Sequence, residues 1–598
     1  MDMTVAGLLA AYRTQGLTPE AVIAHVLARC NEYRAHNIWI TQLTRAQLEP
    51  YLQKLHEHSP DSLPLYGIPF AIKDNIDLAG IPTTAACEAF TYTPQHSAFV
   101  VQQLIDAGAI PIGKTNLDQF ATGLVGTRSP YGACHNAINP EYVSGGSSSG
   151  SAVANALGLV SFALGTDTAG SGRVPASFNN IVGVKPSRGI VSTTGVVPAC
   201  RTLDCVSLFA LTTDDANLVL EHMAVYDAGD PYARPNPFSN SYRHYGMPSG
   251  AFRFGVPATE QLAFFGDDSA RQQFLDSVSK LEALGGIRTE IDFAPFMSAA
   301  KLLYDGPWLA ERYVATEEII TRQPDAMLPV TRTIIDNAKD KSAVDAFKAE
   351  YSLRAYQRQA EQILDAVDFI VTPTAGTIFT IAQVEADPIA LNTQLGYYTN
   401  FMNLLDCAAI AIPAAYLANG LPWGITFFSR ALQDRKLLSY ANRWQQAMQL
   451  PLGATALPLP ASKQSSPGFA QAIPVVVCGA HLDGLPLNWQ LRERGAVLAE
   501  KTTTAAHYRM YALAGGPPYR PGLIRDSKGG NAIEVEVWHV PADQFGSFVA
   551  AIPPPLGIGK LELADGRWLP GFICEGHAIA DAKDISALGG WRRYLAEA

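Results

Sequence analysis

The stretch Tyr142-Val-Ser-Gly-Gly-Ser-Ser-Ser-Gly-Ser151 determines how the rest of this sequence is interpreted. Every residue from Ser144 to Ser151 is Ser or Gly, and an apolar run, residues 152–164, follows at once. Such a segment leaves the backbone unobstructed and offers N–H donors, hydroxyls and a helix N-terminus. A flexible linker is the alternative, but linkers are seldom followed within a turn by an Ala/Leu/Val helix and a second Gly/Ser loop. We therefore predict a site that holds a polar or anionic group by main chain.

The second loop is Gly165-Thr-Asp-Thr-Ala-Gly-Ser171, which continues as Gly172-Arg173-Val174-Pro175. Consecutive N–H groups on a turn of small residues can point together at a developing oxyanion. Ser171 is therefore a candidate nucleophile.

The base that would activate Ser171 is not decided by pattern. No histidine before residue 470 ends a clear apolar strand, which argues against a Ser-His-Asp triad. Lys73 closes the strand-like run Gly67-Ile-Pro-Phe-Ala-Ile-Lys73, and burial would favour its neutral amine, which can accept a proton. Lys114, in Ile110-Pro-Ile-Gly-Lys114, is an equal candidate on this argument.

Four segments in this order resemble the amidase signature enzymes. They are Ala71-Ile-Lys-Asp-Asn75, Gly113-Lys-Thr-Asn-Leu-Asp-Gln-Phe-Ala121, Gly145-Gly-Ser-Ser-Ser-Gly-Ser151 and Gly165-Thr-Asp-Thr-Ala-Gly-Ser171. The resemblance covers about residues 1–450 and implies an α/β fold with a mixed central sheet flanked by helices.

This resemblance implies a role for each matching residue. Ser171 would be the nucleophile, Ser147 a bridging serine with a cis peptide bond, and Lys73 the base. The oxyanion hole would be formed by the main chain of Thr168, Ala169, Gly170 and Ser171. No cofactor or metal is implied. The sequence departs from the family's commoner Thr-Gly-Gly-Ser-Ile-Arg at Ala169 and Gly172, which removes no catalytic group and indicates a subfamily.

A second segment, Tyr304-Asp-Gly-Pro-Trp-Leu-Ala-Glu-Arg312, is similar to the substrate-binding segment of allophanate hydrolases. Gly306-Pro307 predicts a helix start, with Tyr304 on the preceding loop and Arg312 inside the helix. Without the resemblance, an exposed Arg and a packing Tyr are the simpler interpretation. The resemblance implies that Tyr304 and Arg312 hold the substrate carboxylate, to which a planar guanidinium is suited.

Composition limits the possible functions of the 598 residues. Apolar residues at 48% and charged residues at 17% are typical of a globular enzyme. A net charge of −11 argues against a nucleic-acid partner. The eight cysteines include no CxxC pair, so neither zinc nor a disulfide framework is expected. The sequence shows no signal-peptide pattern and no apolar run long enough for a membrane span, so we expect a cytoplasmic protein without a membrane partner.

The chain divides into a predicted amidase signature domain (1–457), a Pro/Ser-rich linker (458–472) and a C-terminal domain (473–598). Strand-like runs in the last part predict an α+β domain. Its opening segment, Val475–Asn488, resembles the gamma-glutamylcyclotransferase-like fold. His481 follows Val475-Val-Val-Cys-Gly-Ala480, so we expect it at a strand-to-loop junction. There it could promote the decarboxylation of the product that the first domain releases. A packing histidine in an assembly domain is the alternative.

The resemblances together imply an allophanate hydrolase of the long two-domain type. It would hydrolyse urea-1-carboxylate at the terminal amide, and the resemblance further implies a homodimer. One rival is an amidase of the same chemistry acting on a neutral amide, which would leave Arg312 without a partner. The other is the amidase component of a tRNA-dependent amidotransferase, which works only in a complex.

Overall fold

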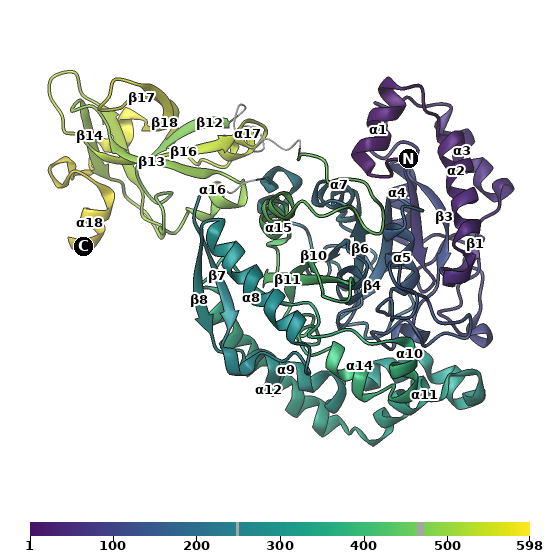
Figure 1. Ribbon diagram of the computed structural model, residues 1–598. Helices are drawn as coiled ribbons and strands as arrows, with labels where there is room; N and C mark the ends of the chain where they lie inside the picture. Colours follow the sequence, from purple (N-terminus) through teal and green to yellow (C-terminus); the bar gives the residue numbers. More distant parts are fainter. Residues whose placement is uncertain (247–249, 463–471, 598) are drawn as a thin grey trace. The chain divides into compact units, whose positions relative to one another are not determined.

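The computed structural model describes residues 1–246, 250–462 and 472–597, which form two compact units (Figure 1). One unit consists of Met1–Asn236 and Tyr245–Gln464, and the other of Pro237–His244 and Ser465–Ala598. The division after Gln464 falls within residues 458–472, the predicted linker, of which 463–471 lie outside the described residues. The short segment Pro237–His244, which belongs to the second unit, carries no sequence signal for that placement.

The first unit is built on a sheet of 11 strands among the residues described. In spatial order the strands are β1 (Trp39–Gln42), β3 (Ile110–Thr115), β2 (Pro69–Lys73), β4 (Phe162–Asp167), β6 (Cys205–Ala210), β5 (Val182–Lys185), β10 (Cys407–Tyr416), β11 (Pro422–Arg430), β9 (Phe369–Pro373), β7 (Phe252–Pro257) and β8 (Gly286–Ile291).

Both parallel and antiparallel pairs occur in this sheet. β2 pairs in parallel with β3 and with β4, whereas β4 and β6 are antiparallel, as are β10 and β11. β2, β9 and nearly all of β10 and β11 are buried, as their continuous apolar runs predict for strands covered on both faces. The mixed central sheet that the resemblance implies is confirmed.

The first unit also contains α-helices, several of which pack directly against this sheet (Figure 1). They are α1 (Val5–Thr14), α2 (Pro19–Glu32), α3 (Arg45–Leu55), α4 (Phe99–Asp106), α5 (Ser149–Ala156), α6 (Val174–Phe178), α7 (Thr213–Met223), α8 (Asp268–Ala283), α9 (Ala294–Asp305), α10 (Leu309–Arg322), α11 (Pro329–Asp336), α12 (Ala343–Leu364), α13 (Ile381–Ala386), α14 (Ala390–Leu395) and α15 (Asp434–Met448). The hydroxyl of Thr18 caps α2 by accepting from the amide of Ala21, with Pro19 in the first helical position.

The apolar run after the Ser/Gly segment does not form one helix. α5 starts inside the Ser/Gly run at Ser149 and ends at Ala156, and β4 begins at Phe162. The turn between them includes Gly158, whose φ of +64° is a conformation that glycine adopts without strain. The Ser/Gly segment and the second loop are therefore connected by one short helix and one buried strand.

The second unit contains two smaller sheets among its described residues. The five-stranded sheet has the order β13 (Val497–Thr503), β16 (Glu534–Pro541), β12 (Ala472–Val477), β18 (Trp568–Cys574) and β17 (Leu556–Glu562), and β15 (Pro521–Arg525), β14 (Tyr508–Ala512) and β19 (Lys583–Asp584) form the three-stranded one. Its helices are α16 (Trp489–Glu493), α17 (Ala542–Ala550) and α18 (Trp591–Glu597). In the larger sheet the pairs are antiparallel except β12 with β18, and the predicted α+β domain is confirmed.

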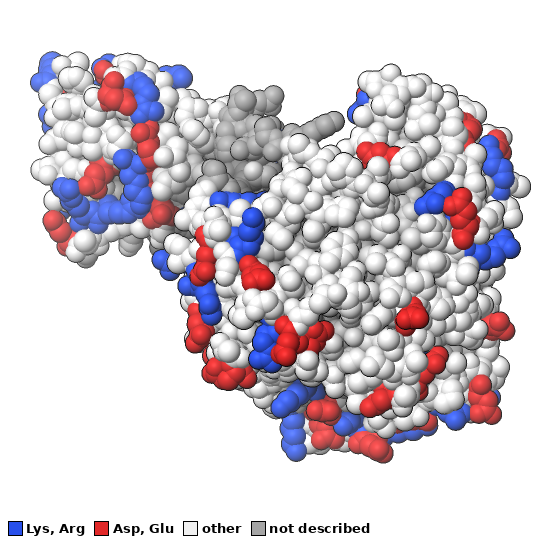
Figure 2. Space-filling view, viewed as in Figure 1, with Lys and Arg blue, Asp and Glu red and all other residues white. Residues whose placement is uncertain are grey.

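The surface has no broad basic area on the face shown in Figure 2, where Lys and Arg lie among Asp and Glu. Within the described ranges, no helix is both long and apolar enough to cross a membrane. In the same residues, no group of three or more His, Cys, Asp or Glu side chains is arranged to hold a metal ion.

Candidate active site

Ser171 lies on the tight turn that joins the end of β4 to α6. The preceding residue, Gly170, has a φ of +135°, and a side chain there would meet Thr399. After the serine, a Cβ at Gly172 would lie 2.5 Å from the Cβ of Ser207 on β6. The glycine that departs from the commoner family sequence is therefore required by the close approach of β6.

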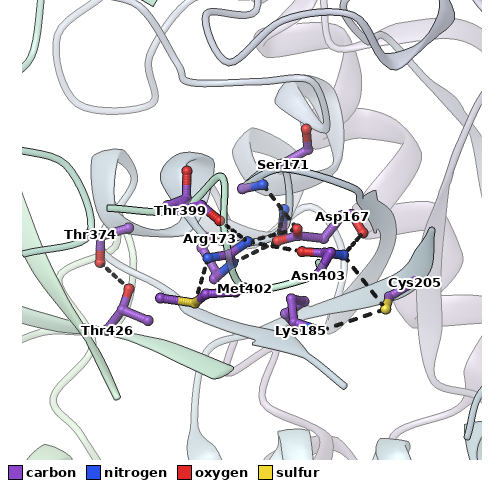
Figure 3. Close-up of polar contacts among 12 residues, drawn as sticks. Asp167, Ser171, Arg173, Lys185, Cys205, Thr374, Thr399, Met402, Asn403 and Thr426 are labelled. Carbon is purple, nitrogen blue, oxygen red and sulfur yellow. Dashed lines mark hydrogen bonds and ion pairs between the residues drawn. The ribbon is translucent and has the colours of Figure 1, made fainter. Parts of the chain in front are cut away.

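Asp167, the last residue of β4, binds the main chain on both sides of the serine (Figure 3). Its Oδ1 accepts from the amide of Gly170 at 2.9 Å and its Oδ2 from the amide of Gly172 at 3.0 Å. Arg173 donates to the same two oxygens, from Nη2 and Nε, at 2.9 Å each. Both charged side chains are fully buried. The loop around Ser171 is therefore held by the ion pair of Asp167 and Arg173, which has no net charge and is called the Asp167–Arg173 clamp below.

The serine oxygen begins a chain of hydroxyls that ends on a lysine. The Oγ atoms of Ser147 and Ser171 are 2.9 Å apart, and Lys73 Nζ lies 2.7 Å from Ser147 Oγ. Lys73 also donates to Thr166 Oγ1 at 2.7 Å. Lys73 ends β2, and Ser147 precedes α5 and follows the cis peptide bond Gly146-Ser147. The structure thus brings together the three residues expected to form the catalytic triad.

The environment of Lys73 favours its neutral form. Burial is the main cause that lowers the pKa of Lys73 to about 7, although Asp118, Asp204 and Asp167 act in the opposite direction. No ion pair joins Lys73 to a carboxylate within the described ranges. A lysine with this pKa can exchange a proton near neutral pH.

The main-chain amides before the serine differ in availability. The amide of Gly170 donates to Asp167 and is not free to bind an oxyanion. The amides of Thr168, Ala169 and Ser171 have no acceptor among the residues described. Of the four amides expected in the oxyanion hole, three therefore have no hydrogen-bond acceptor among the described residues. The amide of Gly170 instead helps to hold the turn.

Lys114, the rival base, has different neighbours. Its Nζ lies 3.1 Å from a carboxylate oxygen of Asp74 and 2.9 Å from the hydroxyl of Thr83. Unlike Lys73, it therefore neutralises a carboxylate and takes no part in the hydroxyl chain of the two serines.

Arg312 lies in the first turn of α10 and is 2% exposed. Its Nη1 donates to the carbonyl of Ala121 at 3.2 Å and to the hydroxyl of Thr122 at 3.0 Å. No carboxylate in the described part of the chain forms an ion pair with it. Burial opposes its charge, but neighbouring groups, Asp204 and Glu311 among them, raise the pKa of Arg312. The guanidinium therefore stays charged, and no anion of the described residues is paired with it.

Tyr304 lies beside this arginine, with its ring centroid 6.0 Å from the guanidinium carbon. The sequence-based placement of Tyr304 on a loop is wrong, because the residue is in the last turn of α9. The helix predicted after Gly306-Pro307 is confirmed as α10. The amide of Gly306 donates to the carbonyl of Leu302 and ends α9 there.

His481 of the second unit lies four residues after β12, at the expected strand-to-loop junction. It borders a cavity of about 210 Å³ that is also lined by Gln490, Arg520 and Phe572. The ring stacks on Phe572 at 5.0 Å, and its Nε2 is 2.9 Å from Gln490 Oε1. Burial is the main cause that lowers the pKa of His481.

Three residues of the site were not singled out from the sequence. Thr166 and Arg173 were in quoted segments, but their side chains carried no motif of their own. Asp204, whose carboxylate accepts from the hydroxyl of Thr168, had no local signal at all.

Comparison with known proteins finds matches to both parts of the chain. The family model described as Amidase matches residues 21–438, and the model described as Allophanate hydrolase C-terminal domain matches residues 473–596. The solved structure of Kluyveromyces lactis allophanate hydrolase is 38% identical, with a TM-score of 0.77 and 99% of each chain covered.

Two further relatives are both urea amidolyases. That of Saccharomyces cerevisiae is 43% identical over 94% of this chain, which spans only 31% of the longer protein. That of Lachancea kluyveri is 41% identical over 93% of this chain and 31% of its own length. The chain therefore corresponds to about one third of each urea amidolyase.

Proposed function

This chain belongs to the amidase family, and from that premise we propose that it hydrolyses allophanate, urea-1-carboxylate. Water would replace the terminal amide nitrogen, giving ammonia and N-carboxycarbamate. The observation that carries the proposal is Arg312, a buried guanidinium without an ion-pair partner in the described part of the chain. A buried unpaired charge is costly, so a site that retains one is suited to an anionic substrate.

We assign the triad roles to Ser171, Ser147 and Lys73. Neutral Lys73 would accept the proton of Ser147, and Ser147 that of Ser171, since hydroxyl hydrogens can reverse along a chain with these distances. Ser171 Oγ would then attack the amide carbon and form an acyl-enzyme. The proton would return through Ser147 to the leaving ammonia, and water would attack the acyl-enzyme by the same relay.

The unoccupied amides of Ala169 and Ser171, with that of Thr168, would donate to the developing oxyanion. Donors held in place before the reaction need no reorganisation as the charge develops. The clamp of Asp167 on Gly170 and Gly172 supports this role, because it fixes the turn that carries these amides.

The substrate carboxylate would bind Arg312 and Tyr304. A guanidinium can bind both oxygens of a carboxylate at once, and the phenol next to it can donate one more hydrogen bond. This assignment favours allophanate over a neutral amide. It also argues against the role in a tRNA-dependent amidotransferase, as does the matched C-terminal domain.

The second unit would act on the product. N-carboxycarbamate carries two carboxylates and loses carbon dioxide on gaining a proton, leaving carbamate. The cavity next to His481 offers Arg520, whose side chain forms no ion pair with the described residues, for a carboxylate. It also offers an imidazole that can move a proton. We propose that this cavity promotes the decarboxylation.

Cellular context extends the proposal. The chain spans about one third of the urea amidolyases it matches. From the names of these relatives we propose a role in urea degradation. We also propose a homodimer and a cytoplasmic location.

Ammonia release by the purified chain tests the main proposal, with allophanate, malonamate, urea and benzamide supplied in parallel. We expect turnover of allophanate and malonamate to exceed that of the two neutral amides. The Ser171→Ala variant, which loses one hydroxyl from a loop held by main chain, should release none while melting like the wild type. Equal activity on benzamide and allophanate would favour the neutral-amide rival.

A further inference from the structure

Asp204 joins the loop of the nucleophile to a neighbouring segment, Ala199–Asp204. Its carboxylate accepts from the amides of Ala199 at 2.8 Å and Cys200 at 3.2 Å, and the residue is 8% exposed. It also accepts a hydrogen bond from the hydroxyl of Thr168, three residues before Ser171. One buried carboxylate thus links the two ends of segment Ala199–Asp204 and joins the segment to the loop that carries Ser171.

The same segment is tied at Thr202 to α10. The amide of Thr202 donates to one carboxylate oxygen of Glu311 at 2.9 Å, and its hydroxyl donates to the other. Glu311 directly precedes Arg312. A further contact, from Cys200 Sγ to the carbonyl of Trp308 at 3.4 Å, joins the segment to the start of α10.

These contacts form one connected path from the reacting serine to the buried arginine. It runs from the Ser171 loop through Thr168, Asp204, Thr202 and Glu311 to Arg312. The connections at its two ends are hydrogen bonds to a carboxylate, of which the one to Asp204 is buried and the one to Glu311 is exposed to solvent.

We infer that segment Ala199–Asp204 is a spacer that fixes the separation of Arg312 from Ser171 and so selects the length of the amido acid substrate. Asp204, Thr202 and Glu311 are its positioning residues. The inference rests on the proposed function, in which Arg312 binds the carboxylate and Ser171 attacks the amide.

The chemistry of the substrate explains why such a spacer matters. In allophanate and in malonamate a single atom separates the carboxylate carbon from the amide carbon. Both ends are bound by groups from distant parts of the sequence, so their separation depends on what links them. A shift of about 1 Å between the reacting atoms can lower turnover about 100-fold.

The test compares substrates of different length and charge in variants of the Thr202 connection. Thr202→Ala, Glu311→Gln and the double variant are assayed on allophanate, malonamate, succinamate, which is one methylene longer, and benzamide. We expect kcat/KM for allophanate and malonamate to fall about 10- to 100-fold, with benzamide within about twofold. The preference for malonamate over succinamate should fall at least about fivefold.

Three controls make the result specific. Because Thr202 and Glu311 act through one contact, the double variant should be no worse than the worse single variant. Thr202→Ser, which keeps the hydroxyl, should restore the length preference. Glu317→Gln changes an exposed carboxylate on the same helix and should leave every rate unchanged.

Equal losses on benzamide and malonamate, or an unchanged preference for malonamate over succinamate, would overturn the inference. A wild-type enzyme that hydrolyses malonamate but not allophanate would instead refute the proposed function. The length preference of the variants would then still decide the role of the spacer.

Discussion

Lys114 and Asp74 form an ion pair in which nitrogen and oxygen are 3.1 Å apart and both side chains are fully buried. Lys73 lies directly before Asp74 in the sequence but contacts two hydroxyls instead of a carboxylate. Sequence pattern treats the two lysines as equal candidates for the base. Burial lowers the pKa of both amines, but the structure distinguishes them by their partners, since Lys114 lies against a buried carboxylate and Lys73 contacts the hydroxyl of Ser147.

Replacing each lysine should therefore affect different properties. Lys73→Ala should lower kcat at least about 1000-fold with little change in melting temperature, because the proton acceptor is lost. Lys114→Ala should have the milder catalytic effect but should destabilise the fold by about 3–5 kcal/mol, since Asp74 is left buried without its partner. Steady-state kinetics and thermal melting measure the two effects. An essential Lys114 together with a dispensable Lys73 would show that the base is misassigned.

The pH dependence of kcat/KM should follow the titration of Lys73. The pKa of Lys73 is lowered to about 7, so the amine is neutral above that pH and protonated below it. Activity should therefore be fully developed above the pKa and should fall about tenfold per pH unit below it. The profile should be recorded with malonamate, and a midpoint near 10 would mean that Lys73 is not desolvated in solution.

Arg312→Ala should harm substrates that carry a carboxylate far more than neutral amides. Loss of one partner of a desolvated charge pair costs roughly 2–5 kcal/mol, or about 30- to several-thousand-fold in kcat/KM. Parallel assays on malonamate and benzamide measure this difference. Arg322→Ala, at an exposed position near the end of the same helix, is the matched control. Equal losses on both substrates would remove Arg312 from the carboxylate site.

His481→Asn in the full-length chain should separate the two proposed reactions. The first ammonia should be released at the wild-type rate, because the amidase site is unchanged. With ¹³C-labelled allophanate, NMR should then show N-carboxycarbamate persisting. His507→Asn, at an exposed position of the same unit, should behave like the wild type. If the His481→Asn variant forms carbamate as quickly as the wild type, His481 does not promote the decarboxylation. A role of the second unit in assembly would then be the better explanation.

The sequence predicted those parts of the fold that depend on local pattern. Continuous apolar runs form the buried strands β9, β10 and β11, and Thr18 followed by Pro19 starts α2, as such patterns predict. The apolar run after Ser151 was less informative, because a short buried helix and a buried strand have the same composition.

The site was predicted only where residues fall in a recognisable segment. Ser171, Ser147 and Lys73 lie in such segments, and the structure brings them into one hydrogen-bonded chain. Asp204 could not be found in this way, because its partner Thr168 lies 36 residues away and nothing local marks it. Tyr304 was misplaced because Gly306-Pro307 marks the end of one helix as well as the start of the next.

The neutrality of the Asp167–Arg173 clamp has an electrostatic consequence for turnover. A lone carboxylate four residues from Ser171, the proposed nucleophile, would repel the negative charge that develops on the substrate oxygen, and burial would strengthen that repulsion. Arg173 cancels this field while both Asp167 oxygens still hold the amides beside Ser171. Arg173 therefore lets the Asp167 carboxylate support the backbone beside Ser171 without raising the barrier to the proposed acylation.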